Sequence, residues 1–435
     1  MREKIKSVIL FILVIISLFL TSLLNFYNFN DRTVPLLEYY PQIKFGDNIE
    51  VLQYLKPTEF IIHFGDNTHT IIKSDNNQYE ILDSAIRDWT FYNIEVEKSI
   101  IKWDDLIKNI EGVEVIFSNP LTFNELINVF EFDNTNYNFE NINRLWIYDE
   151  KGSIKAYFIS DSLDEVYYSN VLITDELLKN YIVDANSEVT YSFFKSSLNS
   201  EGKLVQQMYY LPNEGIDIVR VKETYTILSE TDLIQMLFIN PSAAKNVYEQ
   251  SQKKIVLYTD GINSLQHNII EKDISYYQPV LDYTDQFDLG KDINAAIKFV
   301  NQHGGWDGEY ILENVERNYD EERTEIVFRK YVNGIPLYEE KGIYGLIKMK
   351  VFDGFVSLFQ RSIILIDKSE NEEGKSLSGK EIINIVDGNG LSASDIETIK
   401  LIYKVEKVKD LLVLEPYWLI ETGDNKNIEI LAWSE

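Results

Sequence analysis

Cysteine is absent from the 435-residue sequence. A chain without thiols has no disulfide framework and no thiolate metal site, and it cannot be anchored as a lipoprotein through an N-terminal cysteine. Glycine and proline are also scarce, with 20 and 9 residues, and no low-complexity segment interrupts the chain. Because 45% of the residues are hydrophobic, the chain can bury substantial cores, and long disordered regions are not expected.

Hydrolase and metalloprotease motifs are also absent, since the sequence has neither H-E-x-x-H nor G-x-S-x-G. Residues 374–381 match the first seven positions of the phosphate-binding pattern G-x-x-x-x-G-K-[ST], but Glu381 stands where a magnesium-binding hydroxyl is needed. We therefore expect a polar loop that leads into a capped helix. Carboxylate pairs are inevitable among 70 acidic residues, and none is singled out as a glycosidase pair. The sequence predicts a protein that is not an enzyme and has no cofactor.

Histidine is rare, with four residues in the chain. His63 and His69 lie on neighbouring predicted strands, and together with Asp66 they could hold a metal ion. No recognised metal-ligand spacing accompanies them, so the favoured prediction is that the chain has no metal site.

Basic residues are outnumbered, with 41 Lys and Arg against 70 Asp and Glu, which gives a net charge of −29. Such a surface repels nucleic acid and anionic lipid headgroups. It could attract cations or basic peptides, although solubility alone also explains it. Nucleic acid is therefore excluded as a partner.

Charge is entirely missing from residues 7–30. Residues 7–29 form a run of 23 residues, which is about 34 Å long as a helix and spans a hydrocarbon core of about 30 Å with some tilt. No small-residue cleavage site follows the run. We therefore predict an uncleaved transmembrane helix at 7–29, with a cleaved signal peptide as the alternative.

Residues 1–6 determine the predicted orientation. Arg2, Lys4 and Lys6 outweigh Glu3, which favours a cytoplasmic N-terminus by the positive-inside rule. The prediction is a single-pass protein of the cell membrane with a cytoplasmic stub at 1–6 and all later domains outside the cell.

Ser17, Thr21 and Asn25 are spaced by four residues and share one face of the predicted transmembrane helix. Small and hydroxyl-bearing side chains allow close helix approach, and an amide in lipid seeks a hydrogen-bonding partner. These three residues are the candidate interface with a partner helix. The alternative is that Ser and Thr are merely tolerated in the span and that Asn25 reaches the membrane surface.

The rest of the chain alternates strand runs with single helices, which predicts an α+β fold with helices packed on antiparallel sheets. We expect three domains, at 38–185, 186–287 and 288–435. Hairpins are predicted at 144–160, at 253–270 and around Asn333-Gly334. Helices are predicted at 79–92, 122–132, 173–183, 229–239, 291–303 and 378–389, several with Ser or Thr at the N-cap.

Two stretches resemble a known family. The segment LKPTEFIIHFGD at 55–66, which follows the predicted transmembrane helix, looks like the start of the YycH (WalH) proteins of Gram-positive bacteria. Residues 305–361 are similar to the C-terminal domain that those proteins share with their sibling YycI. The resemblance covers nearly the whole chain, and its motifs are diffuse packing patterns rather than catalytic signatures.

The resemblance implies a non-enzymatic regulator that associates with a YycI-like sibling and with the sensor histidine kinase YycG (WalK), and that tunes the kinase's control of cell-wall metabolism. A homodimer is left open. Residues 327–361, with the sequence NGIPLY, also resemble PepSY-like modules. This second resemblance implies an alternative function as an extracellular peptidase inhibitor or chaperone module.

Overall fold

The computed structural model describes residues 43–97, 101, 103–134, 136–137, 139, 141–160, 166–185, 189–195, 208–250, 254–279, 288–318, 323–391, 396–422 and 427–433. The predicted transmembrane helix, with Ser17, Thr21 and Asn25, lies outside these residues. None of the helices in the described part of the chain is long and apolar enough to cross a membrane.

The first sheet has ten strands among the described residues, in the order β10-β9-β2-β1-β4-β6-β7-β8-β3-β5. Every pairing is antiparallel except that of β3 with β5. The strands are β1 (Glu59–Phe64), β2 (His69–Lys73), β3 (Thr90–Val96), β4 (Glu111–Leu121), β5 (Glu131–Phe132), β6 (Ile142–Glu150), β7 (Ser153–Ile159), β8 (Val166–Leu172), β9 (Tyr191–Lys195) and β10 (Met208–Pro212).

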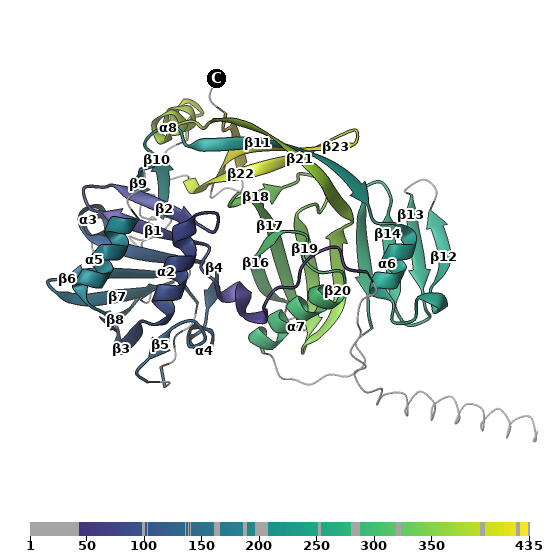
Figure 1. Cartoon of the computed structure of the whole chain (residues 1–435), viewed down its shortest axis with the longest axis horizontal. Coiled ribbons are helices and arrows are strands. Elements are labelled where there is room, and N and C mark those ends of the chain that lie inside the picture. Colours follow the sequence, from purple (N-terminus) through teal and green to yellow (C-terminus); the bar gives the residue numbers. More distant parts are fainter. Residues whose placement is uncertain are drawn as a thin grey trace, which may run out of the picture. The chain divides into compact units, whose positions relative to one another are not determined.

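Both faces of the first sheet are covered. Helices α2 (Asn77–Arg87), α4 (Phe123–Leu126) and α5 (Asp175–Asp184) pack on one face, and α3 (Trp103–Asn109) packs on the other (Figure 1). Side chains alternate between the two faces. On β1, Phe60 and Ile62 enter the core beneath α2, whereas Ile61 enters the core beneath α3. This explains why the central strands are apolar throughout.

The second sheet has 14 strands in the described part of the chain. Its main path is β12-β13-β14-β15-β20-β19-β17-β18-β22-β23-β11-β21, with β16 added to β17 and β24 added to β23. The strands are β11 (Asp217–Ile227), β12 (Lys245–Gln250), β13 (Ile255–Thr259), β14 (Ser264–Asn268), β15 (Asp273–Tyr277), β16 (Glu309–Asn318), β17 (Arg323–Val332), β18 (Ile335–Tyr338), β19 (Leu346–Phe352), β20 (Phe355–Ser362), β21 (Ile364–Lys375), β22 (Ile396–Val408), β23 (Leu411–Thr422) and β24 (Asn427–Leu431).

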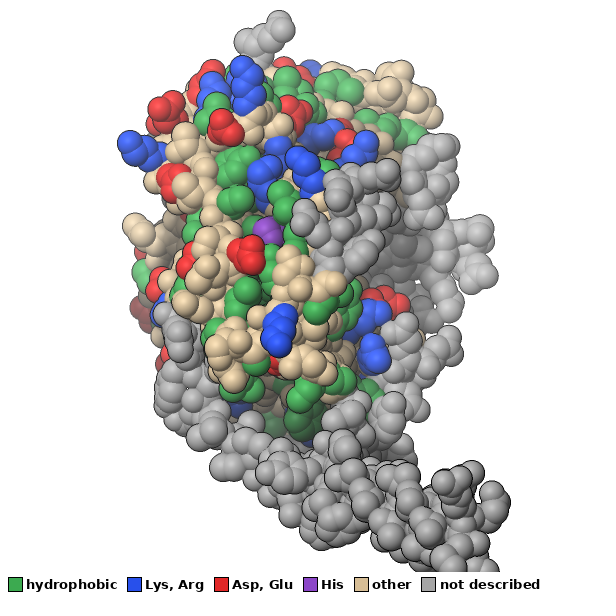
Figure 2. Space-filling model, turned by 90° about the vertical axis from the view of Figure 1, so that its right-hand side faces the viewer, with side chains coloured by type: hydrophobic (Ala, Val, Ile, Leu, Met, Phe, Trp, Pro, Cys, Tyr) green, Lys and Arg blue, Asp and Glu red, His purple; other side chains and the backbone are tan. Residues whose placement is uncertain are grey.

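Two cores support the second sheet. Helices α6 (Glu230–Leu237) and α7 (Leu289–Gln302) cover one part of it, and α8 (Gly379–Gly388) covers another. Two 3₁₀ helices, η2 (Val51–Leu55) and η3 (Pro241–Ala243), complete the described helical elements. Strand β12 ends the sheet path, and Ile239, Val247 and Ile262 in or near the β12–β14 meander are exposed. Figure 2 shows this side of the molecule, with hydrophobic side chains along its middle and basic side chains above them.

The α+β class is therefore confirmed. The domain boundaries at 185/186 and 287/288 stay predictions, and strand pairing continues across both positions. Strands β9 and β10 complete the first sheet, although they follow residue 186, and β11 pairs with β21 and β23.

Most local predictions are confirmed, but the helix predicted at 122–132 is wrong beyond Leu126, where α4 ends, and Glu131–Phe132 form strand β5. The hairpins at 144–160 and 253–270 are β6–β7 and β13–β14. Ser229 and Ser378 cap α6 and α8 through their side-chain oxygens. The helix predicted at 79–92 is wrong at its C-terminal end, because α2 ends at Arg87 and β3 begins at Thr90. Phe91 is paired in the sheet with Val171 of β8, so strand pairing outweighs the local helical spacing.

The turn between β17 and β18 is built as expected for Asn333-Gly334. Both residues have positive φ, at 51° and 67°, which a type I′ turn requires. We expect Gly334→Ala to lower the free energy of unfolding by about 1–2 kcal/mol, because a side chain disfavours this conformation and a Cβ would lie 3.2 Å from Asp75 Oδ1. Chemical denaturation measures this change.

Gly388→Ala is the matched control for this prediction. Gly388 lies in α8, has no positive φ, and a Cβ there would meet nothing within 4 Å. The control should be neutral or slightly stabilising, because alanine favours helix over glycine. Equal destabilisation by both changes would contradict the turn assignment.

Candidate functional site

A buried group of charges lies where α7 leads into β16. Helix α7 ends at Gln302 with His303 as its C-cap, and Gly304 and Gly305 follow with φ values of 98° and 83°. These two glycines reverse the chain and direct Asp307 toward β17 and β20. A Cβ at Gly304 would lie 2.2 Å from the ring of Phe45, so this turn also requires glycine because of close packing.

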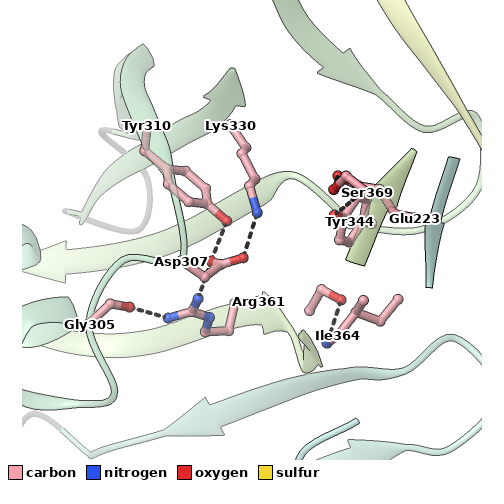
Figure 3. Close-up of polar contacts among 10 residues, drawn as sticks. Glu223, Gly305, Asp307, Tyr310, Lys330, Tyr344, Arg361, Ile364 and Ser369 are labelled. Carbon is pink, nitrogen blue, oxygen red and sulfur yellow. Dashed lines mark hydrogen bonds and ion pairs between the residues drawn. The ribbon is translucent and has the colours of Figure 1, made fainter. Parts of the chain in front are cut away.

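Asp307 is the centre of this group, which we call the Asp307 cluster (Asp307, Tyr310, Lys330, Arg361 and the carbonyl of Gly305). Lys330 Nζ lies 2.7 Å from Asp307 Oδ2, and Arg361 Nη2 lies 2.7 Å from Asp307 Oδ1. The Tyr310 hydroxyl donates to the same Oδ1 at 3.0 Å. Arg361 Nη1 donates to Gly305 O at 2.8 Å. Figure 3 shows these contacts converging on the carboxylate.

Glu223 of β11 lies near this cluster, and its carboxylate interacts electrostatically with Lys330. The Glu223 carboxylate contacts the Tyr344 hydroxyl at 3.5 Å and accepts from Ser369 Oγ at 3.3 Å (Figure 3). The cluster and the contacts of Glu223 together use residues from β11, β16, β17, β20, β21 and the loop before β19, so they join distant parts of the second sheet.

The electrostatics keep Asp307 ionised. Burial alone would raise the pKa of Asp307, but Lys330 and then Arg361 outweigh it and hold the pKa at about 2. Burial raises the pKa of Tyr310 well above its ordinary value, and Asp307 raises it further, so Tyr310 remains a hydroxyl donor. Burial also raises the pKa of Glu223, which the Lys330 ammonium partly offsets.

Residues 43–50, which we call the connector, contact Arg361 of this cluster and the residues that lead from α7 to Asp307. Phe45 N and Gly46 N both donate to Gly304 O, at 2.9 and 3.0 Å. Asp47 and Trp306 exchange two backbone hydrogen bonds of 2.9 and 2.8 Å. The Phe45 ring lies 4.3 Å from the Arg361 guanidinium, a cation–π contact.

Asn301 fixes the far end of the connector. Its side chain accepts from Ile49 N at 3.1 Å and donates to Ile49 O at 2.9 Å. The Trp306 indole N–H also donates to Asn301 Oδ1 at 2.8 Å. The connector is therefore attached to the last turn of α7 and to the residues that lead to Asp307.

This geometry favours coupling rather than catalysis. The Asp307 carboxylate already receives donors from Lys330, Arg361 and Tyr310, so it is not arranged as a base or a nucleophile. Among the described residues, no group of three or more His, Asp or Glu side chains could hold a metal ion. The arrangement links the connector to β16, β17 and β20 through Trp306, Asp307 and Arg361.

A second polar cluster is buried in the first sheet. His63 and His69 do come together, with their Nδ1 atoms 2.9 Å apart. Asp66 does not join them, because it lies in the exposed turn between β1 and β2. Glu114 of β4 is the partner instead, 3.3 Å from His63 Nε2 and in contact with Arg144.

The two imidazoles of this second cluster are neutral at physiological pH. Burial lowers the pKa of His63, and burial together with His63 lowers that of His69 to about 3. Burial would raise the pKa of Glu114, but Arg144 outweighs it and the pKa falls to about 2. The cluster is a packed structural network, and sequence analysis missed Glu114 because its partners come from other strands.

The phosphate-loop resemblance is a helix cap, as the sequence predicted. Ser378 Oγ accepts from Glu381 N at 3.4 Å, and Glu381 Oε2 accepts from Ser378 N at 2.7 Å. This is the reciprocal arrangement of a capping box. Glu381, the residue that departs from the nucleotide-binding pattern, is needed for the cap.

The Asp307 cluster was not predicted, although the sequence contains a signal for it. In β17, Lys330 continues the alternation of Ile326 and Phe328 and is 6% exposed, on the core-facing side. A lysine in register with buried hydrophobic residues requires a buried anion. The partner, Asp307, is 23 residues away in the sequence, and nothing in the local pattern identifies it.

Two family models match the chain. The model described as "YycH protein, N-terminal domain" matches residues 3–187, and "YycH protein, C-terminal domain" matches residues 206–434. A curated relative from Bacillus subtilis (strain 168), named "Two-component system WalR/WalK regulatory protein YycH", is 20% identical over 451 residues. The alignment covers 97% of this chain and 95% of the relative.

A solved structure shows the same fold. The crystal structure of YycH from Bacillus subtilis superposes with a TM-score of 0.66 at 18% sequence identity. The superposition covers 89% of this chain and 99% of that chain. The similarity thus extends through both sheets rather than one domain.

Proposed function

Because the chain belongs to the YycH family, we propose that it is a non-enzymatic regulator of a two-component sensor histidine kinase of the YycG (WalK) type. The observation that carries this proposal is the match over 97% of the chain to a protein named as a regulator of the WalR/WalK system. The family resemblance of residues 55–66 and 305–361 is confirmed by these comparisons.

The proposed setting is the outer face of the cell membrane. In this proposal, residues 7–29 anchor the chain with the N-terminus in the cytoplasm, and the described domains act outside the cell together with a YycI-like sibling. Control of cell-wall metabolism would follow through the kinase. A homodimer stays an open prediction.

The connector supports a regulatory role. It begins 14 residues after the predicted transmembrane helix, counted from residue 29 to residue 43, and it is attached to the Asp307 cluster. A regulator needs two states that its partner distinguishes. A change in the position of the helix relative to the outer domains would act on the second sheet through this attachment.

Replacing Ser17, Thr21 and Asn25 together with Leu should reduce recovery of the kinase from solubilised membranes. Interhelical packing and hydrogen bonds supply helix affinity in lipid, at roughly 0.6–2 kcal/mol per bond, so the loss should be partial. The measurement is quantitative co-purification with the tagged full chain.

The control for this prediction is the replacement of Ile12, Ile15 and Phe19 with Leu, because these residues lie on the opposite face of the predicted helix. An equal loss in both variants would show that Ser17, Thr21 and Asn25 are not part of the interface. Recovery of an extracellular peptidase in place of the kinase would favour the PepSY-like alternative.

A further inference from the structure

The hairpin of β9 and β10 joins the two sheets, because its side chains enter a different core on each face. Phe193 and Tyr210 lie in the core of the first sheet beneath α3. Tyr209 and Leu211, on the other face, lie in the core of the second sheet beneath α8. Strand β10 is also followed directly by β11, a strand of the second sheet. A change in the attachment of this hairpin therefore affects both sheets.

Backbone pairing attaches this hairpin only weakly to the rest of the first sheet. Strands β9 and β10 pair with each other along their whole length. In the described part of the chain, by contrast, β9 and β2 pair through a single residue pair, His69 with Tyr191. A side-chain contact adds to it, since Phe193 N donates to Asn67 Oδ1 at 3.3 Å. The attachment therefore depends on the side chains between the hairpin and β1, β2 and β4.

The histidine pair of the second polar cluster lies directly beneath β10. His63 Nδ1 and His69 Nδ1 are 2.9 Å apart, and both residues are 0% exposed. The centre of the Tyr210 ring lies 5.9 Å from that of His63 and 5.0 Å from that of His69. The Tyr210 hydroxyl donates to Glu114 Oε2 at 2.9 Å. The contacts that hold β10 on the first sheet thus run through the two histidines and Glu114.

The groups around the pair leave no negative charge for an added proton. The charged and titratable side chains of the neighbouring elements are Glu59 of β1, Glu114 of β4, Arg144 of β6, Tyr191 of β9, Tyr210 of β10 and Lys108 of α3. Burial raises the pKa of both tyrosines, so they stay neutral. Glu114 is already paired with Arg144. A proton on either imidazole would therefore be an uncompensated buried charge, which is costly.

Protonation also breaks the contact between the two rings. The contact between the Nδ1 atoms of His63 and His69 has room for one hydrogen, with one nitrogen donating and the other accepting. When both imidazoles are protonated, both Nδ1 atoms carry a hydrogen and the contact becomes repulsive. Burial lowers the pKa of His63, and burial with His63 lowers that of His69 to about 3. Imidazoles that are released to water titrate at about 6.5.

We propose that the His63–His69 pair is an acid-sensitive latch that holds the β9–β10 hairpin on the first sheet. At neutral pH both rings are uncharged and the hairpin is attached. The open state binds more protons than the closed state, so the stability of the latch is fully present above about pH 6.5 and is lost progressively as the pH falls below it. Acid thus releases the hairpin from the first sheet. The inference does not depend on the proposed kinase partner.

The test is hydrogen–deuterium exchange of the purified full chain at about pH 7.5 and about pH 5.5. Exchange rates divided by the intrinsic rate at each pH report the population of the open hairpin. Each histidine that gains a proton on opening raises this population about tenfold between the two pH values. We therefore expect a rise of about 100-fold in β9 and β10 of the wild-type chain, and no such rise in β7 of the same sheet.

Three variants assign the protons. His63→Gln and His69→Gln should each reduce the rise to about tenfold, because one histidine of the pair remains. His267→Gln, at a buried histidine of β14, is the matched control and should keep the full rise. The wild-type measurement is a test by itself, so a variant that does not fold leaves the inference open to refutation. Unchanged wild-type exchange in β9 and β10, an equal rise in β7, or the same rise in His69→Gln and His267→Gln would overturn it.

Discussion

Asp307→Asn should lower the free energy of unfolding by about 3–5 kcal/mol, because removing one partner of a buried ion group leaves uncompensated charge. The substitution leaves Lys330 and Arg361, which are 6% and 2% exposed, facing a neutral amide. Chemical denaturation of the full chain measures the change. Asp387→Asn, at an exposed position of α8, should stay within about 0.5 kcal/mol.

The pH dependence separates a charge effect from a simple packing defect. The pKa of Asp307 is lowered from 3.8 to about 2 in the folded state. Its contribution, about 2 kcal/mol, is therefore fully present above the unfolded pKa and is lost as the pH falls from about 4 to about 2. The Asn variant should lack this component of the acid transition. An unchanged acid transition would contradict the assigned role of Asp307.

Phe328→Ala should lower the free energy of unfolding by a similar amount, about 3–5 kcal/mol, because the substitution leaves a cavity in place of a fully buried phenylalanine ring. Phe328 is 2% exposed, and its ring lies 5.0 Å from that of Trp306 in an edge-to-face arrangement. The loss is enough to unfold a marginally stable domain, so partner binding should disappear together with the folded state. A circular dichroism melt measures the stability.

Phe355→Ala is the matched control, since Phe355 is 62% exposed at the start of β20. It should change stability by about 0.5 kcal/mol or less. A Phe328→Ala chain that melts normally and yet fails to bind its partner would instead place Phe328 in a binding surface.

Local signals in the sequence predicted most of the individual elements. Asn333-Gly334 determines its turn by backbone conformation, and Ser378 with Glu381 determines a helix start through a three-residue spacing. Such features need no information from elsewhere in the chain. In β17, Ile326 and Phe328 alternate with more exposed residues and face the core formed with α7, which is a pattern that the local sequence carries.

The joining of elements could not be predicted in this way. Strand β11 pairs with β21 along most of its length, for example Lys222 with Glu370, and nothing near either strand specifies the other. The same limit applies to the candidate site. Lys330 stood out by its register, but Asp307, Arg361 and Glu223 reach it only through the assembled sheet.

The connector also has a consequence for the order of folding. The hydrogen bonds between Ile49 and Asn301 span 252 residues, and the cation–π contact of Phe45 requires Arg361. Closing so long a loop is slow, because the chain must lose conformational entropy before the non-local contact contributes any stabilising energy. During synthesis, residues 43–50 cannot reach their final contacts until more than two-thirds of the chain has been made. Their docking is therefore a late event in folding.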